Sequence, residues 1–243
     1  MRIVLFGPPA SGKGTQAYKL KETLGIPHVS TGDMLRQAAQ EPGSLGDEVR
    51  AVPTGTFASD DLILRLIQAE LDKPAYKKGV ILDGFPRTKA QAEAMIKMGL
   101  DVDVVIEFKV DQEVLTERII NRRVHPSSGR IYNLLSHPPK QEGVDDVTGE
   151  TLIHRADDTL DVVVGRFKDF DLKTRPAIEA FKQATKGFWI QIDGMRSEDE
   201  VAFDVQQGLD TVSRLRKMCP KAHGTLVFDG QTTPQPLKKP KMG

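Results

Sequence analysis

The sequence predicts an α/β protein of three layers, with a central parallel sheet between two layers of helices. The buried strands are indicated by short, almost uniformly apolar runs at residues 3–6, 80–82, 102–108 and 188–192. Amphipathic helical patterns separate these runs, at residues 16–24, 60–71, 89–98, 112–122, 158–184 and 198–215. Strands that alternate with helices favour a parallel sheet covered on both faces. In such sheets, ligands bind at the carboxyl ends of the strands.

A glycine-rich turn joins the first strand to the first helix. It reads Gly7-Pro8-Pro9-Ala10-Ser11-Gly12-Lys13-Gly14-Thr15. The strand–turn–helix context indicates a phosphate-binding P-loop rather than an ordinary turn with a solvated lysine. Backbone N–H groups of such a loop surround phosphate oxygens, and the helix N-terminus faces the same anion. Lys13 can then reach the β- and γ-phosphates, whereas Gly14 stands where other P-loops carry a magnesium-binding Ser or Thr.

The composition sets limits on the function. The 243 residues are enough to bury a sizeable core. Lys plus Arg and Asp plus Glu are both 34, so no overall basic field argues for a nucleic-acid partner. Cys219 is the only cysteine, which excludes an intrachain disulfide. No apolar run approaches the roughly 20 residues of a membrane helix. Because the first strand begins at Met1, we expect no leader peptide and a cytoplasmic protein without membrane or nucleic-acid partners.

A second polar motif follows the strand at residues 80–82. Asp83 ends this strand, where P-loop enzymes place the acid that positions magnesium, often through water. Taken alone, Asp83 could instead cap a turn or a helix, which is the less favoured alternative. The segment Gly84-Phe85-Pro86-Arg87 follows directly, and Gln91 lies four residues beyond it.

Three stretches depart from the alternation. Residues 30–58 begin with Ser30-Thr31-Gly32-Asp33 and hold two short helical patterns. Residues 122–158 are rich in proline and glycine, which is typical of an inserted lid. Residues 217–243 carry five lysines and one acid, a local charge of +4 that leaves −4 for the remainder. We expect this tail to be extended or disordered and non-catalytic, although residues 226–228 could instead dock on the body.

The motifs together resemble the adenylate kinase family in its long-lid form. The resemblance rests on the loop ending Gly-Lys-Gly-Thr, the Asp83 turn with Gln91, and the segments 30–36, 122–125, 128–132 and 145–150. It spans residue 1 to about residue 212. It implies a core P-loop domain formed by 1–29, 59–121 and 159–216, an AMP-binding insert at 30–58, a lid at 122–158 and the tail at 217–243.

The resemblance also implies an activity and a site. A monomer would transfer phosphate reversibly from MgATP to AMP, giving two ADP, with lid closure excluding water. The implied catalytic residues are Lys13, Arg87, Arg122, Arg155 and Arg166. The implied ATP-binding residues are Ala10, Ser11, Gly12, Lys13, Gly14, Thr15, Arg122, Ile131, Tyr132 and Arg196. The implied AMP-binding residues are Thr31, Arg36, Thr56, Phe57, Ala58, Gly84, Phe85, Pro86, Arg87, Gln91, Arg155 and Arg166. Asp83 would hold Mg²⁺ through water.

This sequence departs from the family pattern at several positions. Ala10 replaces a family glycine and would be strained if its φ must be positive. Thr56-Phe57-Ala58 stands where the family usually ends in Leu-Val, and Arg196 stands where many members have lysine. In some relatives, four lid cysteines bind structural zinc. The matching positions are His125, Ser128, Asp145 and Thr148. Hydroxyls are poor zinc ligands, so we expect no zinc and a hydrogen-bond network among these four residues, the alternative being solvated loop residues.

Other functions remain open at this point. A GTP:AMP enzyme or another nucleoside monophosphate kinase is the nearest alternative, because the family contacts to the donor base are mostly backbone and apolar. Gln91 favours AMP, since the similar uridylate–cytidylate kinases tend to carry asparagine there. A nucleotide-binding switch or assembly protein is the alternative from another class. The arginine set argues against it, because a switch needs no second phosphate cradle.

Overall fold

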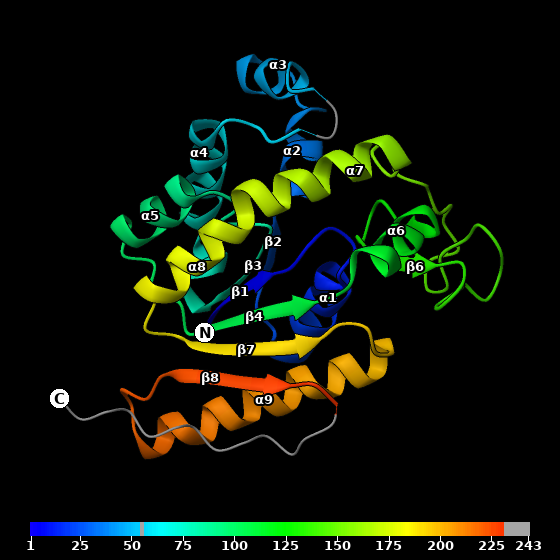
Figure 1. Cartoon of the computed structure of the whole chain (residues 1–243). Coiled ribbons are helices and arrows are strands. Elements are labelled where there is room, and N and C mark those ends of the chain that lie inside the picture. Colours follow the sequence, from blue (N-terminus) through cyan, green and yellow to red (C-terminus); the bar gives the residue numbers. More distant parts are fainter. Residues whose placement is uncertain (54–55, 231–243) are drawn as a thin grey trace.

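The computed structural model of this chain describes residues 1–53 and 56–230. Within this range the main sheet has the strand order β2-β3-β1-β4-β7-β8, and every neighbouring pair is parallel (Figure 1). The strands are β1 (Arg2–Phe6), β2 (His28–Ser30), β3 (Val80–Asp83), β4 (Val104–Lys109), β7 (Phe188–Asp193) and β8 (Gly224–Phe228). All of their carboxyl ends therefore lie at one edge of the sheet, which we call the ligand edge.

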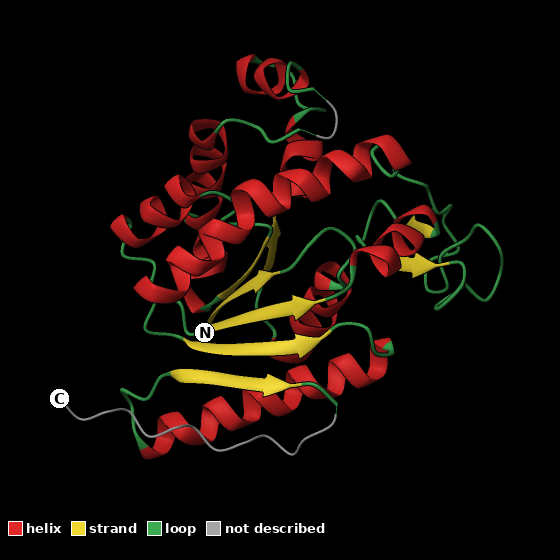
Figure 2. Ribbon diagram, viewed as in Figure 1, coloured by secondary structure: helices red, strands yellow, loops and turns green. Residues whose placement is uncertain are grey.

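Helices cover both faces of the sheet (Figure 2). One face packs on α1 (Lys13–Leu24) and α9 (Glu198–Met218), and the other on α4 (Asp60–Leu71), α5 (Lys89–Lys97) and α8 (Arg175–Ala184). In β1, Ile3 and Leu5 point to the first face, and Val4 and Phe6 to the second. Because both faces are buried, the strand needs apolar residues at every position, which explains its uniform composition.

Two inserts flank the ligand edge. The segment between β2 and α4 contains α2 (Thr31–Ala38) and α3 (Ser44–Arg50), and the Ser30 side chain caps α2 by accepting from the Asp33 N–H. The lid contains the antiparallel pair β5 (Arg122–Val124) and β6 (Ile131–Asn133) between α6 (Gln112–Ile120) and α7 (Leu160–Asp169). The remaining helical pieces are the 3-10 helix Pro74–Lys78 and the π-helical segment Phe170–Thr174, which joins α7 to α8.

The structure corrects three expectations. α6 ends at Ile120, so Arg122 and Arg123 begin a lid strand instead of ending a helix. β2, which is only three residues long, is missing from the predicted strands. The expectation of an undocked tail is wrong for residues 224–228, which form β8: the alternative, that residues 226–228 dock on the body, is confirmed by the Leu226 and Phe228 side chains, which are buried against α9 and β7. The rest of the tail, residues 231–243, lies outside the described residues. No helix within the described range is long and apolar enough to cross a membrane.

Candidate functional site

The P-loop lies at the ligand edge between β1 and α1. Gly12 has φ +94° and caps α1. Gly7 has φ +154°, and a methyl group there would lie 2.5 Å from the Ser11 Oγ. Ala10 has φ +60° and is the only non-glycine residue with positive φ among those described. Because its φ is positive, the backbone of Ala10 is strained, as expected from the sequence for alanine at this position. Ala10 packs against an apolar cluster of α6 and α7, and this packing holds the strained conformation in place.

Lys13 lies within the loop. Its Nζ donates to the carbonyl oxygens of Gly7 at 2.8 Å and Pro8 at 2.7 Å, and to the Ser11 Oγ at 3.3 Å. Burial lowers the pKa of Lys13 to about 8, because desolvation disfavours the ammonium; Asp83 opposes the shift, while nearby arginines add to it. The ammonium is thus held beside the backbone N–H groups of the loop, which can donate to phosphate oxygens.

Asp83 ends β3 and lies beside the loop. The sheet register pairs it with Leu5 of β1 and Ser30 of β2, and its Oδ2 is 3.5 Å from the His28 Nε2. Burial alone would raise the pKa of Asp83, but His28 and Lys13 hold it below its ordinary value. The carboxylate is therefore ionised at neutral pH. A carboxylate oxygen is a ligand that suits Mg²⁺, which usually keeps several waters and binds substrate phosphates.

Two neighbouring acids, the half-buried Asp157 and the buried Asp158, hold lid and α7 arginines at this edge. Arg122 donates from Nε to the Asp158 Oδ2 at 2.8 Å and makes a second contact to Oδ1, while Asp158 is almost fully buried. Arg166 pairs with Asp157 and lies 3.8 Å from Asp158. Bidentate contacts of this kind fix a guanidinium in orientation as well as in place.

Arg36 of the insert and Arg155 of the lid both lie close to Asp33 at the ligand edge. Arg36 pairs with Asp33 and lies 4.0 Å from Asp157. The Arg155 guanidinium is 3.7 Å from Asp33, so insert and lid residues share one carboxylate. Burial lowers the pKa of Arg155 to about 10, and the charges of Arg122 and Arg36 add to the shift. The arrangement gathers more positive charge than its carboxylates neutralise, which favours an anionic ligand.

The Asp83 turn joins the two halves of the site. Arg87 donates from Nε to the Gly84 carbonyl at 2.7 Å, and Thr31 donates to the same oxygen at 2.9 Å. The Arg87 N–H donates to the Gln91 Oε1 at 2.8 Å, and the Gln91 Nε2 donates to Asp60 at 2.8 Å. Burial lowers the pKa of Arg87 as well. Both ends of the Gln91 amide are thus fixed, with the second Nε2 hydrogen left for a ligand.

Not every residue implied for AMP binding offers its side chain to this region. Phe85 and Ala58 are core side chains, 0% and 8% exposed, so only their backbone can contact a ligand. The Thr56 hydroxyl donates to the Pro53 carbonyl at 2.7 Å. The Phe57 ring, in contrast, lies 5.5 Å from the Arg87 guanidinium carbon, within range of a cation–π contact.

The lid reaches the P-loop side of the site. A methyl group on Gly14 would lie 2.9 Å from the Ile131 Cδ1, so these two residues are in contact. The Tyr132 ring is buried in the lid, and its hydroxyl donates to Asp145 at 2.9 Å, so it does not face the loop. Arg196 pairs instead with Asp204 and Glu200 of α9.

Sequence reasoning did not single out Arg118 on α6. Burial lowers the pKa of its guanidinium, and Asp193 at the end of β7 opposes the shift. A partly buried arginine next to the ligand edge is a candidate for contact with an anionic or aromatic ligand. The one feature of the sequence that points to Arg118 is its position on α6, the helix that follows β4.

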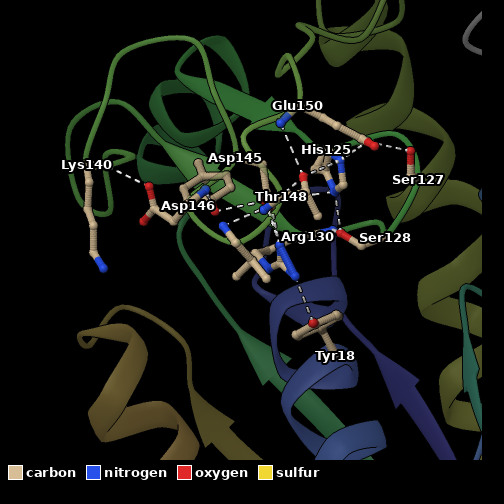
Figure 3. Close-up of polar contacts among 12 residues, drawn as sticks. Tyr18, His125, Ser127, Ser128, Arg130, Lys140, Asp145, Asp146, Thr148 and Glu150 are labelled. Carbon is tan, nitrogen blue, oxygen red and sulfur yellow. Dashed lines mark hydrogen bonds and ion pairs between the residues drawn. The ribbon is translucent and has the colours of Figure 1, made fainter.

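The four lid positions at zinc-ligand spacing are joined by hydrogen bonds (Figure 3). The His125 ring contacts the Ser128 Oγ at 2.7 Å through Nδ1 and the Thr148 Oγ1 at 3.2 Å through Nε2. Thr148 donates to Asp145 at 3.0 Å, and Arg130 contacts both Asp145 carboxylate oxygens at 2.6 Å. Burial would raise the pKa of Asp145, but Arg130 and Thr148 hold it well below its usual range. Within the described residues, no three His, Cys, Asp or Glu side chains are grouped to hold a metal ion.

Replacing His125, Ser128, Asp145 and Thr148 together with cysteine is expected to create a tetrahedral site that binds one zinc and raises the melting temperature of the lid. The natural protein is expected to hold no stoichiometric zinc and to melt unchanged in chelator. Elemental analysis and calorimetry with and without chelator measure both. Tight zinc in the natural protein would contradict the network interpretation, and a four-cysteine variant without zinc would show that the wrong positions are paired.

Comparison with known proteins decides the family. The family model described as adenylate kinase matches residues 5–186, which include the P-loop, the insert, the Asp83 turn and the lid. The chain belongs to the adenylate kinase family. An adenylate kinase of Sodalis glossinidius (strain morsitans) is 43% identical over 209 residues, covering 84% of this chain and 98% of that protein. The match to the family model, as distinct from that to the relative, ends before β7, so α9 and β8 lie outside the family model.

Proposed function

We propose that this chain transfers the γ-phosphoryl group of MgATP to AMP, reversibly giving two ADP, through the residues at its ligand edge. The observation that carries the proposal is the convergence of basic side chains from five parts of the chain: the P-loop, the insert, the Asp83 turn, the lid and α7. They are Lys13, Arg36, Arg87, Arg122, Arg155 and Arg166. A single nucleotide on the P-loop does not require basic groups on the far side of the Asp83 turn. Two facing phosphate groups do require them.

The basic side chains divide into two roles. Phosphoryl transfer passes through a loose transition state, so its rate comes from in-line positioning and from neutralising charge. Lys13, Arg122, Arg155 and Arg166 surround the transferred group, and Arg36 and Arg87 hold the phosphate of AMP. No general base is needed, because the acceptor phosphate is already an anion. The acids that pair with these arginines act as positioning residues, since they hold each guanidinium before substrate arrives.

Magnesium enters with ATP. Bound together with ATP, Mg²⁺ would supply positive charge against the negative charge that develops on the phosphates. Asp83 would hold the ion through its waters, in agreement with the ionised carboxylate beside the P-loop. His28, with its Nε2 at 3.5 Å from the Asp83 Oδ2, lies beside that carboxylate.

The insert and the lid exclude water from the reaction. Water attacking ATP would turn the enzyme into an ATPase, so the site must close only around both substrates. The contact of Ile131 with Gly14, and the bond of 3.2 Å from Arg130 to the Tyr18 hydroxyl, support a lid that closes on α1. Asp33 lies between Arg36 of the insert and Arg155 of the lid, so it can couple the two motions.

A coupled assay of ADP formation from ATP and AMP tests the proposal. ADP from the two nucleotides together, and not from ATP alone, is the expected result. ADP from ATP alone would favour the switch or assembly protein. Steady-state rates with GTP as donor and with UMP, CMP and GMP as acceptors separate the remaining nucleoside monophosphate kinases. We expect AMP to be the best acceptor, because Gln91 is fixed beside Arg87.

Binding of ATP is expected to take up protons at alkaline pH. The pKa of Lys13 is lowered to about 8 in the free protein, and phosphate oxyanions beside the ammonium raise it again. Uptake is therefore about half a proton at pH 8 and nearly one at pH 9, and ATP affinity falls as the pH rises above 8. Calorimetry in buffers of different ionisation enthalpy measures this uptake. Lys13→Met should abolish it, and equal uptake in the variant would assign the proton to another group.

A further inference from the structure

β8 extends the sheet beyond the part of the chain that the adenylate kinase family model matches. It pairs in parallel with β7, from Phe188 opposite Gly224 to Ile192 opposite Phe228. Because parallel strands run in one direction, the turn that follows β8 emerges at the ligand edge, as the P-loop does. Figure 1 shows β8 and β7 side by side with their arrows pointing the same way. The turn consists of Asp229 and Gly230.

Gly230 lies against the side chain of Arg196. A methyl group on Gly230 would lie 3.0 Å from the Arg196 Nε and 3.1 Å from its Cδ and Cζ, so the glycine backbone covers the inner part of the guanidinium. Gly230 also has φ +73°, a conformation that other residues rarely adopt. Both the backbone conformation and the close approach thus require glycine at this position.

α9 holds Arg196 from another direction. The guanidinium pairs with Asp204 and, at 3.1 Å, with Glu200. Asp204 is only 7% exposed, and burial raises its pKa, with Asp229 of the turn adding to the shift. Arg196 is therefore fixed between α9 and the turn after β8. Asp193 at the end of β7 favours the charged form of both Arg196 and Arg118, so both arginines lie near that end of the strand.

We propose that β8 and its turn form a wall of the donor-nucleotide site, with Gly230 as a positioning residue for Arg196. The inference rests on the proposed function and on the ATP-binding role that the family resemblance implies for Arg196. The segment after β7 does reach the P-loop, because a methyl group on Gly194 would lie 3.3 Å from the Ser11 carbonyl oxygen. A free arginine loses rotamer entropy when it orders against a ligand. A guanidinium already ordered by Gly230 avoids that loss when ATP binds. The contact should therefore set the affinity for the donor, and not the rate of transfer or the affinity for AMP.

Gly230→Ala tests the proposal. The KM for ATP is expected to rise about three- to tenfold, the range for disordering one long side chain, with kcat and the KM for AMP unchanged. The matched control is Gly99→Ala. Gly99 has φ +67°, but no atom lies within 4 Å of a methyl group there, so the variant carries the same backbone strain without the contact. A second variant, Gly230→Asn, introduces the same close approach with less strain, because asparagine tolerates positive φ.

A double-mutant cycle isolates the contact with Arg196. In an Arg196→Ala background, Gly230→Ala is expected to leave the KM for ATP unchanged. An unchanged KM in both single Gly230 variants overturns the proposal, as does a full Gly230→Ala effect in the absence of the Arg196 side chain. Equal rises of the KM values for ATP and AMP also overturn it, because they indicate a general loss of structure. Failure to form ADP from ATP and AMP in the unmodified protein is a different result, and it contradicts the proposed function instead.

Discussion

Replacing Lys13 with alanine is expected to lower kcat by about two to three orders of magnitude, the usual cost of one preorganised charge at a reacting group. The Nζ lies within the loop, bonded to two carbonyls that carry no charge to neutralise it. Transfer of the phosphoryl group moves negative charge toward this ammonium, so its loss raises the transition state more than the ground state. Steady-state kinetics at saturating ATP and AMP measure the effect.

Lys19→Ala is the matched control for Lys13→Ala. Lys19 lies on the same helix, and its ammonium is 2.9 Å from Glu198 and 3.1 Å from Asp199, both on α9. Removing this partly exposed pair should leave kcat near that of the unmodified protein. Thermal melting of both variants distinguishes a local defect from unfolding. A kcat for Lys13→Ala within fivefold of the unmodified value, with the fold intact, would contradict the role of Lys13.

Replacing Arg87 with alanine is expected to act on the acceptor. The KM for AMP should rise by about a hundredfold, the cost of losing charge-assisted hydrogen bonds of about 1.5–3 kcal/mol each. It should rise at least as much as ATP affinity falls. The reason is that Arg87 lies in the Asp83 turn, between Gly84 and Gln91, with its guanidinium directed by the Gly84 carbonyl. Separate titrations with AMP and with ATP measure the two affinities.

Arg65→Ala serves as the control for Arg87→Ala. Arg65 is an exposed arginine of α4 that pairs with Glu48 at 2.7 Å and Asp61 at 2.9 Å. This variant tests whether the loss of any arginine near the insert weakens the binding of AMP. Its AMP affinity should match that of the unmodified protein. If Arg87→Ala binds AMP as tightly as Arg65→Ala does in calorimetry, the acceptor assignment of Arg87 is wrong.

The strands that the sequence predicted are those buried on both faces. β1, β3, β4 and β7 consist mainly of apolar residues, because a central parallel strand has no solvent face. β2 has a single buried side chain among three residues, which is too little for any pattern to show. β8 does alternate buried and exposed residues, but it is flanked by prolines, glycines and lysines whose composition is typical of a disordered segment.

The polar contacts of the site were less predictable than its motifs. Local spacing identified the P-loop and the Asp83 turn, because each motif is continuous in sequence. The bond of Arg122 to Asp158, 36 residues away, depends on how the lid folds back. Glu107 is a clearer case. This buried acid of β4 accepts from the Trp189 Nε1 and the Gln191 Nε2, both at 2.9 Å, and these partners exist only once β4 and β7 are in register.

The position of β8 has a consequence for biosynthesis. The ribosome synthesises the chain from its N-terminus to its C-terminus, so α9 is complete before β8 emerges. Leu226 and Phe228 supply part of the apolar surroundings of Val205 and Leu209 on α9. Until these two residues arrive, the outer side of that core is open to water, chaperones and proteases. We expect nascent chains stalled before Gly224 to be cut within α9 by a protease that leaves the finished protein intact.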